Sequence, residues 1–333
     1  MKILFTLDYE LFLGEKTGSM QKCLMEPMQA YAESIEKYGA RFTLFVDATY
    51  LLKLRDYSSQ YPLLEKEYRS IVKHLQELQH KGHEIQLHIH PHWFYSTYNG
   101  TEWILDHDHY KLSDLTLKEA EHIFTVSKEL LDRIAGKPSI AFRAGGFSAQ
   151  PTKMLAHLFQ TAGIKIDTSV CPGMWYNSSQ QKYDYRKCPN ESSWDFCNDI
   201  CQEEKNGRLL EIPIATHLLS PVFYWKLILK RFIKSSEHQL MGDGKAINTT
   251  VESIWERVTK KTLGIATIDG FKISYLKDAY FVYKKKQKKI FCILGHPKLA
   301  TAYSIKKLEE FCRYATEQGD QFVTISQCYE KEN

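Results

Sequence analysis

The stretch Gly82-His83-Glu84-Ile85-Gln86-Leu87-His88-Ile89-His90-Pro91-His92 decides how the rest of the sequence is understood. It follows a segment, from about Pro62 to His80, in which apolar residues recur at the spacing of a helix. A glycine just past a helix adopts the left-handed conformation of a C-terminal cap at little cost. The stretch therefore predicts the end of a helix, a short strand, and a polar cluster where the strand ends.

The same order of helix, glycine and strand recurs along the chain. The glycines that mark it are Gly39, Gly82, Gly136, Gly163 and Gly319. Alternating helices and strands indicate a parallel sheet. Further strands are expected at Lys2–Leu7, Leu209–Ile214 and Ile290–Leu294, which brings the total to about seven or eight. We therefore expect an α/β fold, a distorted (β/α) barrel of the triosephosphate-isomerase type, rather than an open sheet.

Length and composition favour one globular domain over residues 1–333. Hydrophobic residues make up 43% of the chain and charged residues 25%, which excludes a disordered or fibrous protein. The net charge of +4, from 44 basic and 40 acidic side chains, is too small to indicate a nucleic-acid partner. Two segments depart from the αβ pattern: an irregular insertion at about residues 172–207 and an elaborated segment at about residues 216–289.

The N-terminus and the cysteines predict a cytoplasmic protein. Residues Met1–Asp8 contain only a short apolar stretch before a charge, so we do not expect a signal peptide. Eight cysteines in 333 residues are too few for a disulfide framework, so reduced thiols are expected. Cys188, Cys197 and Cys201 lack the paired spacing of a zinc ribbon and are also expected to be free thiols.

Ionisable residues follow several of the expected strands at their carboxyl ends. They are Asp8-Tyr9-Glu10, His88–His92, Arg143, Asp167 and His296. In an α/β barrel these strand ends meet at one mouth, where catalytic residues are found. Each position alone would be a weak signal, but together they predict an active site at that mouth.

His88 and His92 are four residues apart and could present two imidazoles to one metal ion. A carboxylate from Asp8 or Glu10 would complete a set of two histidines and one carboxylate, with a position left open for water. That set suits zinc or another divalent first-row metal. His90 lies between the two histidines and is expected to support the ligands rather than bind the ion. The alternative is a group of surface histidines in a loop.

These motifs, in this order and spacing, resemble those of the polysaccharide deacetylases of carbohydrate esterase family 4, which include chitin and peptidoglycan deacetylases. The matching stretches are Phe5–Glu10, Gly82–His92, Phe142–Gly146, Ile166–Ser169 and Leu294–Pro297. The resemblance spans residues 1 to about 330, although the stretch between Asp167 and His296 is unusually long. It implies a distorted barrel and metal-dependent deacetylase chemistry.

The resemblance also implies a role for each residue of the first two motifs. Asp8 matches the family's catalytic base, which takes a proton from the metal-bound water, and His88 and His92 match its two metal-binding histidines. The family's metal-binding aspartate directly follows the base, but Tyr9 stands there in this chain. Because tyrosine is a poor replacement for a carboxylate, Glu10 is expected to be the third ligand.

The remaining motifs supply the other groups that the resemblance implies. Arg143 matches the arginine that orients the base, and His296 matches the general acid that protonates the leaving amine. Asp167 matches the carboxylate that tunes this histidine, and such a pair would raise the histidine pKa and keep the ring charged. Gly145 and Gly146 replace a proline and an aromatic residue, which changes the usual substrate contacts of that loop.

The residues and the resemblance together predict a metal-dependent amide hydrolase that uses zinc, cobalt, nickel or another first-row metal. The expected reaction is N-deacetylation of an N-acetylated sugar in a glycan, or in a glycan precursor of surface-polysaccharide assembly. Two alternatives stay open. One is hydrolysis of a non-sugar amide such as a cyclic ureide, as in allantoinases. The other is a carbohydrate-binding barrel that has lost turnover, which Tyr9 in place of aspartate would explain.

Two basic segments could bring the protein to a membrane surface. Residues 218–234 are apolar with basic interruptions, as in an interfacial amphipathic helix, and residues 284–289 are lysines interrupted by one glutamine. No apolar run reaches the length of a membrane span. Peripheral contact would suggest a lipid-linked glycan substrate at the inner face of the membrane. The alternative, an ordinary barrel helix and a solvated turn, is the simpler interpretation.

Overall fold

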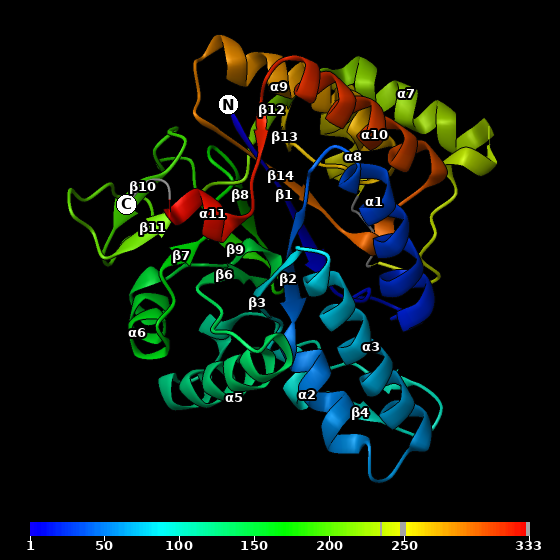
Figure 1. The fold of residues 1–333 in the computed structure, drawn as a ribbon, viewed down its shortest axis with the longest axis vertical. Helices are drawn as coiled ribbons and strands as arrows, with labels where there is room; N and C mark the ends of the chain where they lie inside the picture. The colour runs from blue at the N-terminus through cyan, green and yellow to red at the C-terminus, as the bar shows by residue number, and fades with distance from the viewer. Residues whose placement is uncertain (234, 247–250, 331–333) are drawn as a thin grey trace. The chain divides into compact units, whose positions relative to one another are not determined.

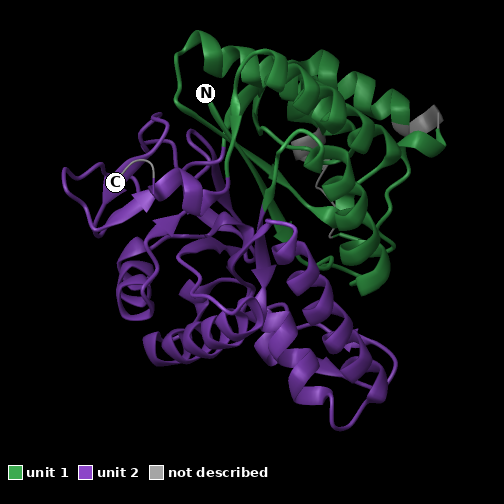
Figure 2. Cartoon of the chain, in the orientation of Figure 1, with its two compact units in different colours: residues 1–42, 215–323 green, residues 43–214, 324–333 purple. Residues whose placement is uncertain are grey.

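The computed structural model describes residues 1–233, 235–246 and 251–330 (Figure 1). The chain forms two compact units (Figure 2). The first contains Met1–Phe42 and Ala215–Val323, and the second contains Thr43–Ile214 and Thr324–Asn333. Each unit is built from two separate parts of the chain. The boundary between the units therefore does not correspond to a single linker or change of composition in the sequence. Lys234, the last residue of the predicted membrane segment, lies outside the described residues.

The first unit is organised around β1 (Lys2–Tyr9), a strand whose apolar side chains are almost completely buried. Two strands, β14 (Ile290–Gly295) and β15 (Gln321–Phe322), run parallel to β1. The other elements of this unit are η1 (Gln21–Met25), α1 (Glu26–Glu36), β12 (Thr216–Leu219), α7 (Pro221–Ile233), η4 (Ser236–His238), α8 (Val251–Thr259), β13 (Thr262–Ile265), η5 (Gly270–Tyr275), α9 (Leu276–Lys285), η6 (Pro297–Leu299) and α10 (Ala302–Glu317). Strand pairs buried on both faces are typical of parallel sheets covered by helices.

Residues 266–268 add a short parallel segment beside β14. Thr267 forms a parallel bridge with Leu294, and the amide of Ile268 donates to the carbonyl of Leu294 at 3.0 Å. The segment is too short for sequence patterns to reveal. It places Asp269 directly after a segment that runs parallel to β14, much as His296 directly follows β14.

The second unit contains six neighbouring strands, in the order β2–β3–β6–β7–β11–β10. They are β2 (Phe42–Asp47), β3 (Glu84–Ile89), β6 (Ala141–Ala144), β7 (Ile166–Asp167), β11 (Leu209–Glu211) and β10 (Trp194–Phe196). All the pairings are parallel except that β10 runs antiparallel to β11. The helices and short strands of this unit are α2 (Ala48–Tyr57), α3 (Pro62–His80), α4 (His92–Tyr95), β4 (Thr97–Tyr98), β5 (Trp103–Ile104), η2 (Leu112–Asp114), α5 (Leu117–Ala135), η3 (Gly145–Phe147), α6 (Thr152–Ala162), β8 (Trp175–Asn177), β9 (Lys182–Asp184) and α11 (Ile325–Glu330).

The predicted fold class is confirmed: the chain is an α/β protein with a mostly parallel sheet, of the distorted (β/α)-barrel type. The glycines that suggested it have the predicted geometry. Gly39, Gly82, Gly136, Gly163 and Gly319 all have positive φ. Gly136 and Gly163 are the left-handed caps of α5 and α6, where a side chain at the cap would be strained.

The irregular insertion at residues 172–207 contains three short strands, β8, β9 and β10, and one disulfide. The disulfide joins Cys188 and Cys201, so the prediction that both are free thiols is wrong. Their separation of thirteen residues gives no zinc-ribbon spacing, yet the loop brings the two cysteines together. Cys197 is a free cysteine, as predicted.

The elaborated segment at residues 216–289 forms helices around a two-stranded antiparallel sheet, β12 with β13. Its small apolar cluster contains Leu219, Phe223 and Tyr275, with Leu227 and Phe271 packed against them. Helix α7 begins with Pro221 and contains most of the sequence predicted to meet a membrane surface. In the described part of the chain, no helix combines the length and the apolar character needed to cross a membrane.

Candidate active site

Strand β1 positions two carboxylates of the predicted site, Asp8 within the strand and Glu10 directly after its last residue. The carboxylates of Asp8 and Glu10 both approach Nε2 of His296, at 3.7 and 3.8 Å. Tyr9 lies between them and is 2% exposed. Burial raises the pKa of the Tyr9 phenol, so the group stays protonated. Their shared approach to one ring nitrogen therefore pairs Glu10, and not Tyr9, with Asp8.

His296 follows β14 and is held by an aspartate that the sequence did not single out. Its Nδ1 lies 2.9 Å from Oδ2 of Asp269, and its backbone N–H donates to Oδ1 of Asp269 at 2.8 Å. Burial acts to lower the pKa of His296, but the charge and hydrogen bond of Asp269 and the charge of Asp8 outweigh it, so the pKa is raised. Burial acts to raise the pKa of Asp269, but the charge and hydrogen bonds of His296 lower it. Asp269 and Asp8 therefore favour the protonated form of the His296 ring.

This geometry corrects the carboxylate that was predicted to tune His296. The family resemblance implied Asp167 for that role, but Nδ1 of His296 is hydrogen-bonded to Asp269, and Nε2 faces Asp8 and Glu10. The signal that could have found Asp269 is its place after the short parallel segment 266–268. Three residues are too few to show a strand period in the sequence.

Lys298 is a second residue of this site that sequence reasoning missed. Its Nζ donates to Oε1 of Glu10 at 2.8 Å and to the carbonyl of Leu11 at 2.6 Å, and the residue is only 6% exposed. A buried ammonium needs a counter-charge and hydrogen-bond acceptors, and Glu10 supplies one of each. The contact with Lys298 holds the Glu10 carboxylate in one position in the site.

In the second unit, β3 places His88 at its carboxyl end, 1% exposed. Nδ1 of His88 lies 2.7 Å from the carbonyl oxygen of Arg143, its register partner on β6. Because a carbonyl oxygen can only accept, Nδ1 carries the hydrogen and Nε2 holds the lone pair. This is the tautomer that a metal-binding histidine requires.

His90 lies beside His88 in the same unit. The two ring centroids are 4.7 Å apart, and one ring nitrogen of each histidine lies within 4.8 Å of the other. The backbone of His90 is fixed by Thr49, whose Oγ1 lies 2.9 Å from its carbonyl oxygen and accepts from its N–H at 3.2 Å. A Cβ at Gly145 would lie 2.7 Å from Nδ1 of His90. Glycine at that position therefore leaves room for the imidazole.

His92 begins helix α4 and is completely buried. Its ring stacks on Tyr110, with centroids 4.8 Å apart, and lies 5.3 Å from the ring of Trp93. The centroid of the His92 ring is 5.6 Å from that of His90. The role of His92 as a metal ligand stays a prediction, and the structure adds His90 as a second candidate next to His88.

Arg143 is completely buried on β6. Its Nε donates to the carbonyl of Thr168 at 3.0 Å, and Nη2 donates to Oγ1 of Thr168 at 3.1 Å. The guanidinium carbon lies 4.3 Å from the centre of the Phe45 ring, a cation–π geometry. These contacts hold the guanidinium in one orientation. Its predicted pairing with Asp8 stays a prediction.

Asp167 and Glu211 form a buried carboxyl pair on the neighbouring strands β7 and β11. Ser169 donates to Asp167 from its backbone N–H at 2.8 Å and from its hydroxyl at 3.0 Å. Burial raises the pKa of Asp167 to about 6, although hydrogen bonds with Glu211 and Ser169 and the charge of Arg143 act to lower it. The two buried carboxyl groups lie on paired residues of neighbouring strands, and the burial that raises the pKa of Asp167 favours its protonated form. The sequence did not indicate Glu211.

No protein-family model matches the sequence, and no curated protein matches it. Solved structures do resemble it. A protein from Mycobacterium smegmatis, assigned as a polysaccharide deacetylase, is 13% identical with a TM-score of 0.52, over 99% of this chain and 89% of that one. A GH57-type branching enzyme from Pyrococcus horikoshii is 10% identical with a TM-score of 0.52, over 100% of this chain and 70% of that one. The chain therefore has a polysaccharide deacetylase-like fold.

Proposed function

We propose that this protein is a metal-dependent amide hydrolase that removes acetyl groups from N-acetylated sugars. The observation that carries the proposal is His296. Asp269 holds the ring through Nδ1 and raises its pKa, and Nε2 faces the carboxylates of Asp8 and Glu10. Hydrolysis of an amide needs a proton for the departing amine, and an imidazolium held in one orientation supplies it.

The donor set fits a divalent metal ion. Nε2 of His88 is the ring nitrogen without a hydrogen, and a nitrogen of His90 lies within 4.8 Å of a nitrogen of His88. We assign His88 and His90 as the imidazole ligands, with His92 as the alternative that the family resemblance implies, and Glu10 as the carboxylate ligand. Zinc, cobalt and nickel all suit such a set. A bound ion of this kind lowers the pKa of a water ligand to about 7 and polarises an amide carbonyl.

The remaining residues divide the proton transfers between them. Asp8 takes a proton from the attacking water, and His296 gives a proton to the leaving nitrogen. Their closest approach of 3.7 Å, from Oδ2 of Asp8 to Nε2 of His296, supports their action on one substrate. Arg143 orients Asp8, and the carboxyl pair of Asp167 and Glu211 supports Arg143, whose charge acts on the pKa of Asp167.

The proposed substrate is an N-acetylated sugar in a glycan or glycan precursor. The fold likeness to the Mycobacterium smegmatis protein supports this class. A cyclic ureide or another non-sugar amide is the alternative substrate. The competing function without turnover is carbohydrate binding. The pair of His296 and Asp269 favours turnover, because burying a charged pair costs stability that simple binding would not require.

Contact with the inner face of a membrane is part of the proposal. On α7, Val222, Trp225 and Leu229 are spaced by three and four residues, so they share one face, and they are 57–58% exposed. Lys226 is exposed on the same helix, and tryptophan next to lysine is typical of membrane interfaces. A cytoplasmic location is proposed with it, although the disulfide of Cys188 and Cys201 favours a less reducing compartment.

Vesicle sedimentation tests the membrane contact. The intact protein is expected to sediment with vesicles that contain phosphatidylglycerol and to bind neutral phosphatidylcholine vesicles at least about tenfold more weakly. Trp225→Asp is expected to abolish sedimentation. Trp175→Asp changes a tryptophan of matching exposure, 56%, in the insertion and is expected to leave sedimentation unchanged. Equal losses in both variants, or no sedimentation of the intact protein, would contradict the contact.

Acetate release tests the enzymatic proposal. The purified chain, loaded with zinc, cobalt or nickel, is expected to release acetate from oligosaccharides of N-acetylglucosamine, and His296→Gln is expected to lose about a hundredfold or more in rate. If the protein hydrolyses allantoin but releases no acetate from the oligosaccharides, its substrates are non-sugar amides. If the protein binds oligosaccharide but hydrolyses no amide with any of these metals, it is a carbohydrate-binding barrel that has lost turnover.

A further inference from the structure

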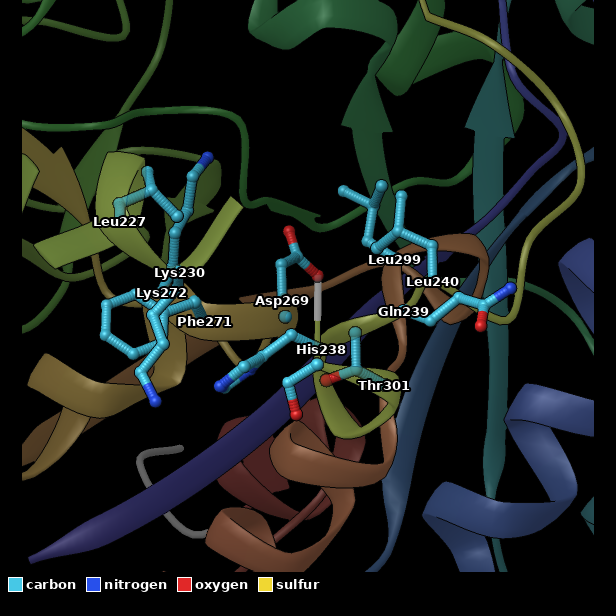
Figure 3. Close-up of a pocket in the computed structure, with 12 residues that line it drawn as sticks. Leu227, Lys230, His238, Gln239, Leu240, Asp269, Phe271, Lys272, Leu299 and Thr301 are labelled. Carbon is cyan, nitrogen blue, oxygen red and sulfur yellow. The ribbon is translucent and has the colours of Figure 1, made fainter. Parts of the chain in front are cut away.

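A cavity of about 630 Å³ lies in the first unit, against the aspartate that holds His296 (Figure 3). Its wall includes Asp269, the turn that follows it in η5, the end of α7, and the segment around η4. Both carboxylate oxygens of Asp269 are already bonded to His296. A ligand in the cavity would therefore lie directly behind the proposed general acid.

His238 gives the cavity an unusual polar wall. Its side chain is 9% exposed, and its ring packs against Tyr303 and Phe271, with centroids 4.6 and 5.5 Å away. Within the described residues neither ring nitrogen makes a hydrogen bond. Nε2 lies 3.2 Å from a carboxylate oxygen of Glu237, and Nδ1 has no polar partner in the same residues. A buried ring nitrogen without a partner costs free energy that a bound ligand would recover.

Basic side chains give the same cavity a positive wall. Lys230 of α7 and Lys272 of η5 both line it, together with His238. The acidic lining residue is Asp269, and both of its carboxylate oxygens are already bonded to His296. The lining thus contains two ammonium groups and a donor-capable imidazole, which are groups that bind phosphate.

Apolar side chains form the rest of the cavity. Leu227, Leu240, Phe271 and Leu299 line it, and Figure 3 shows Leu240 and Leu299 on the side opposite Lys230 and Phe271, with Asp269 between them. Leu240 is 43% exposed, so the apolar wall continues to the surface. A volume of this size accommodates a ligand of several carbon atoms next to its polar group.

We infer that this cavity binds a phosphate ester with an apolar substituent, and that this group is the carrier end of the substrate. The inference rests on the proposed function, because a carrier end placed behind Asp269 would leave the acetamido end on the Nε2 side of His296. The basic side chains and His238 would hold the phosphate, and the leucines and Phe271 would hold the first part of the apolar chain. The substrate class is then a sugar linked through phosphate to an apolar carrier.

Calorimetric titration of the full chain tests this inference without any turnover. The probes are decyl phosphate below its critical micelle concentration, decanol, and inorganic phosphate. Decyl phosphate is expected to bind at least about tenfold more tightly than either of the others, since only it meets both walls of the cavity. The double variant Lys230→Met with Lys272→Met, and the variant His238→Phe, are expected to weaken decyl phosphate by about tenfold or more while decanol binding stays within about twofold.

Lys226→Met is the matched control, because Lys226 lies on the same helix, is exposed and is absent from the cavity wall. It is expected to leave all three affinities unchanged. An equal loss with Lys226→Met would overturn the inference in favour of diffuse surface charge. Decyl phosphate binding no tighter than decanol, or no tighter than inorganic phosphate, would overturn it as well. Thermal unfolding midpoints close to that of the unmodified protein show that the variants fold.

The same titrations separate the inference from the proposed function. If decyl phosphate binds as expected but no N-acetylated sugar is deacetylated, the cavity stands as a binding site and the enzymatic proposal fails. If free oligosaccharides are deacetylated but decyl phosphate does not bind, the enzyme stands and the carrier end is wrong. Binding only to vesicles of phosphatidylglycerol, with no binding of monomeric decyl phosphate, would assign the chemistry to the membrane surface and overturn the cavity.

Discussion

The histidines of the two units have contrasting surroundings. In the first unit, His296 is bonded to a carboxylate, faces two others, and has a raised pKa. In the second unit, Nδ1 of His88 meets a neutral carbonyl, and the backbone of His90 is fixed by the hydroxyl of Thr49. A carboxylate favours the charged ring, whereas a carbonyl fixes a neutral tautomer. The first arrangement suits a proton donor, and the second suits a metal ligand.

Of the changes proposed here, removal of the His88 side chain is expected to have the largest effect on metal binding and on kcat. His88→Ala takes away the nitrogen with the best-defined tautomer and is expected to abolish metal binding and to lower kcat by about a thousandfold or more. His90→Ala and His92→Ala, measured by the metal retained after desalting, decide which histidine is the second ligand. His80→Ala at the end of α3 is the control and is expected to retain the ion. Full metal content in His88→Ala would refute the assignment of this cluster.

Asp269→Asn is expected to have the next largest effect, of about a hundredfold in kcat. Because Asp269 raises the pKa of His296, its loss is expected to move the alkaline limb of the kcat profile to lower pH. Asp167→Asn changes the residue that the sequence predicted for this role and is expected to leave the alkaline limb in place. If the alkaline limb shifts in Asp167→Asn but not in Asp269→Asn, then Asp167 is the carboxylate that raises the pKa of His296.

Gly145→Ala tests how closely the second site is packed. The added methyl would lie 2.7 Å from both Nδ1 of His90 and the carbonyl oxygen of Ile89, so we expect a loss of about 1–3 kcal/mol in unfolding free energy. We also expect weaker metal binding, since the imidazole must move. Gly136→Ala meets no atom within 4 Å but has a φ of +64°, so it is expected to cost about 1 kcal/mol and leave metal binding intact. Equal metal affinity in both variants would show that the position of His90 is irrelevant to the ion.

Asp167→Asn is expected to have the smallest effect, seen in the pH dependence of stability. The pKa of Asp167 is raised to about 6 from an ordinary value near 3.8, so the native state holds a proton that the unfolded state releases. Stability from this group is present at low pH and is lost as the pH rises through about 4 to 6. The variant is expected to lack this decline, worth about 1–3 kcal/mol, in urea unfolding series at pH 4 and pH 7. Parallel pH trends in the two proteins would argue against a raised pKa of Asp167 in the native state.

The sequence predicted the fold through features that act locally. A glycine after a helix adopts its conformation whatever lies around it, and the glycines at positions 39, 82, 136, 163 and 319 all have positive φ. Site residues at the ends of strands could also be predicted from the sequence, because each is adjacent in the chain to the strand that positions it. His296 directly follows β14, and His88 is the penultimate residue of β3.

The partners of these residues were harder to predict, because they come from distant parts of the chain. Asp269 lies 27 residues before His296 and follows a segment too short to show a strand period. Glu211 lies beside Asp167 only through the parallel pairing of β7 and β11. Cys188 and Cys201 meet through the path of an irregular loop. Resemblance to a family supplied Asp167 as the partner of His296, whereas hydrogen-bond geometry supplied Asp269.

The central claim is that the two histidine sites have different tasks, and metal stoichiometry tests it most directly. The intact protein, His88→Ala and His296→Gln are each incubated with zinc, desalted, and analysed for bound metal. The account predicts about one ion per chain in the intact protein and in His296→Gln, and none in His88→Ala. Loss of the ion in His296→Gln together with its retention in His88→Ala would contradict it.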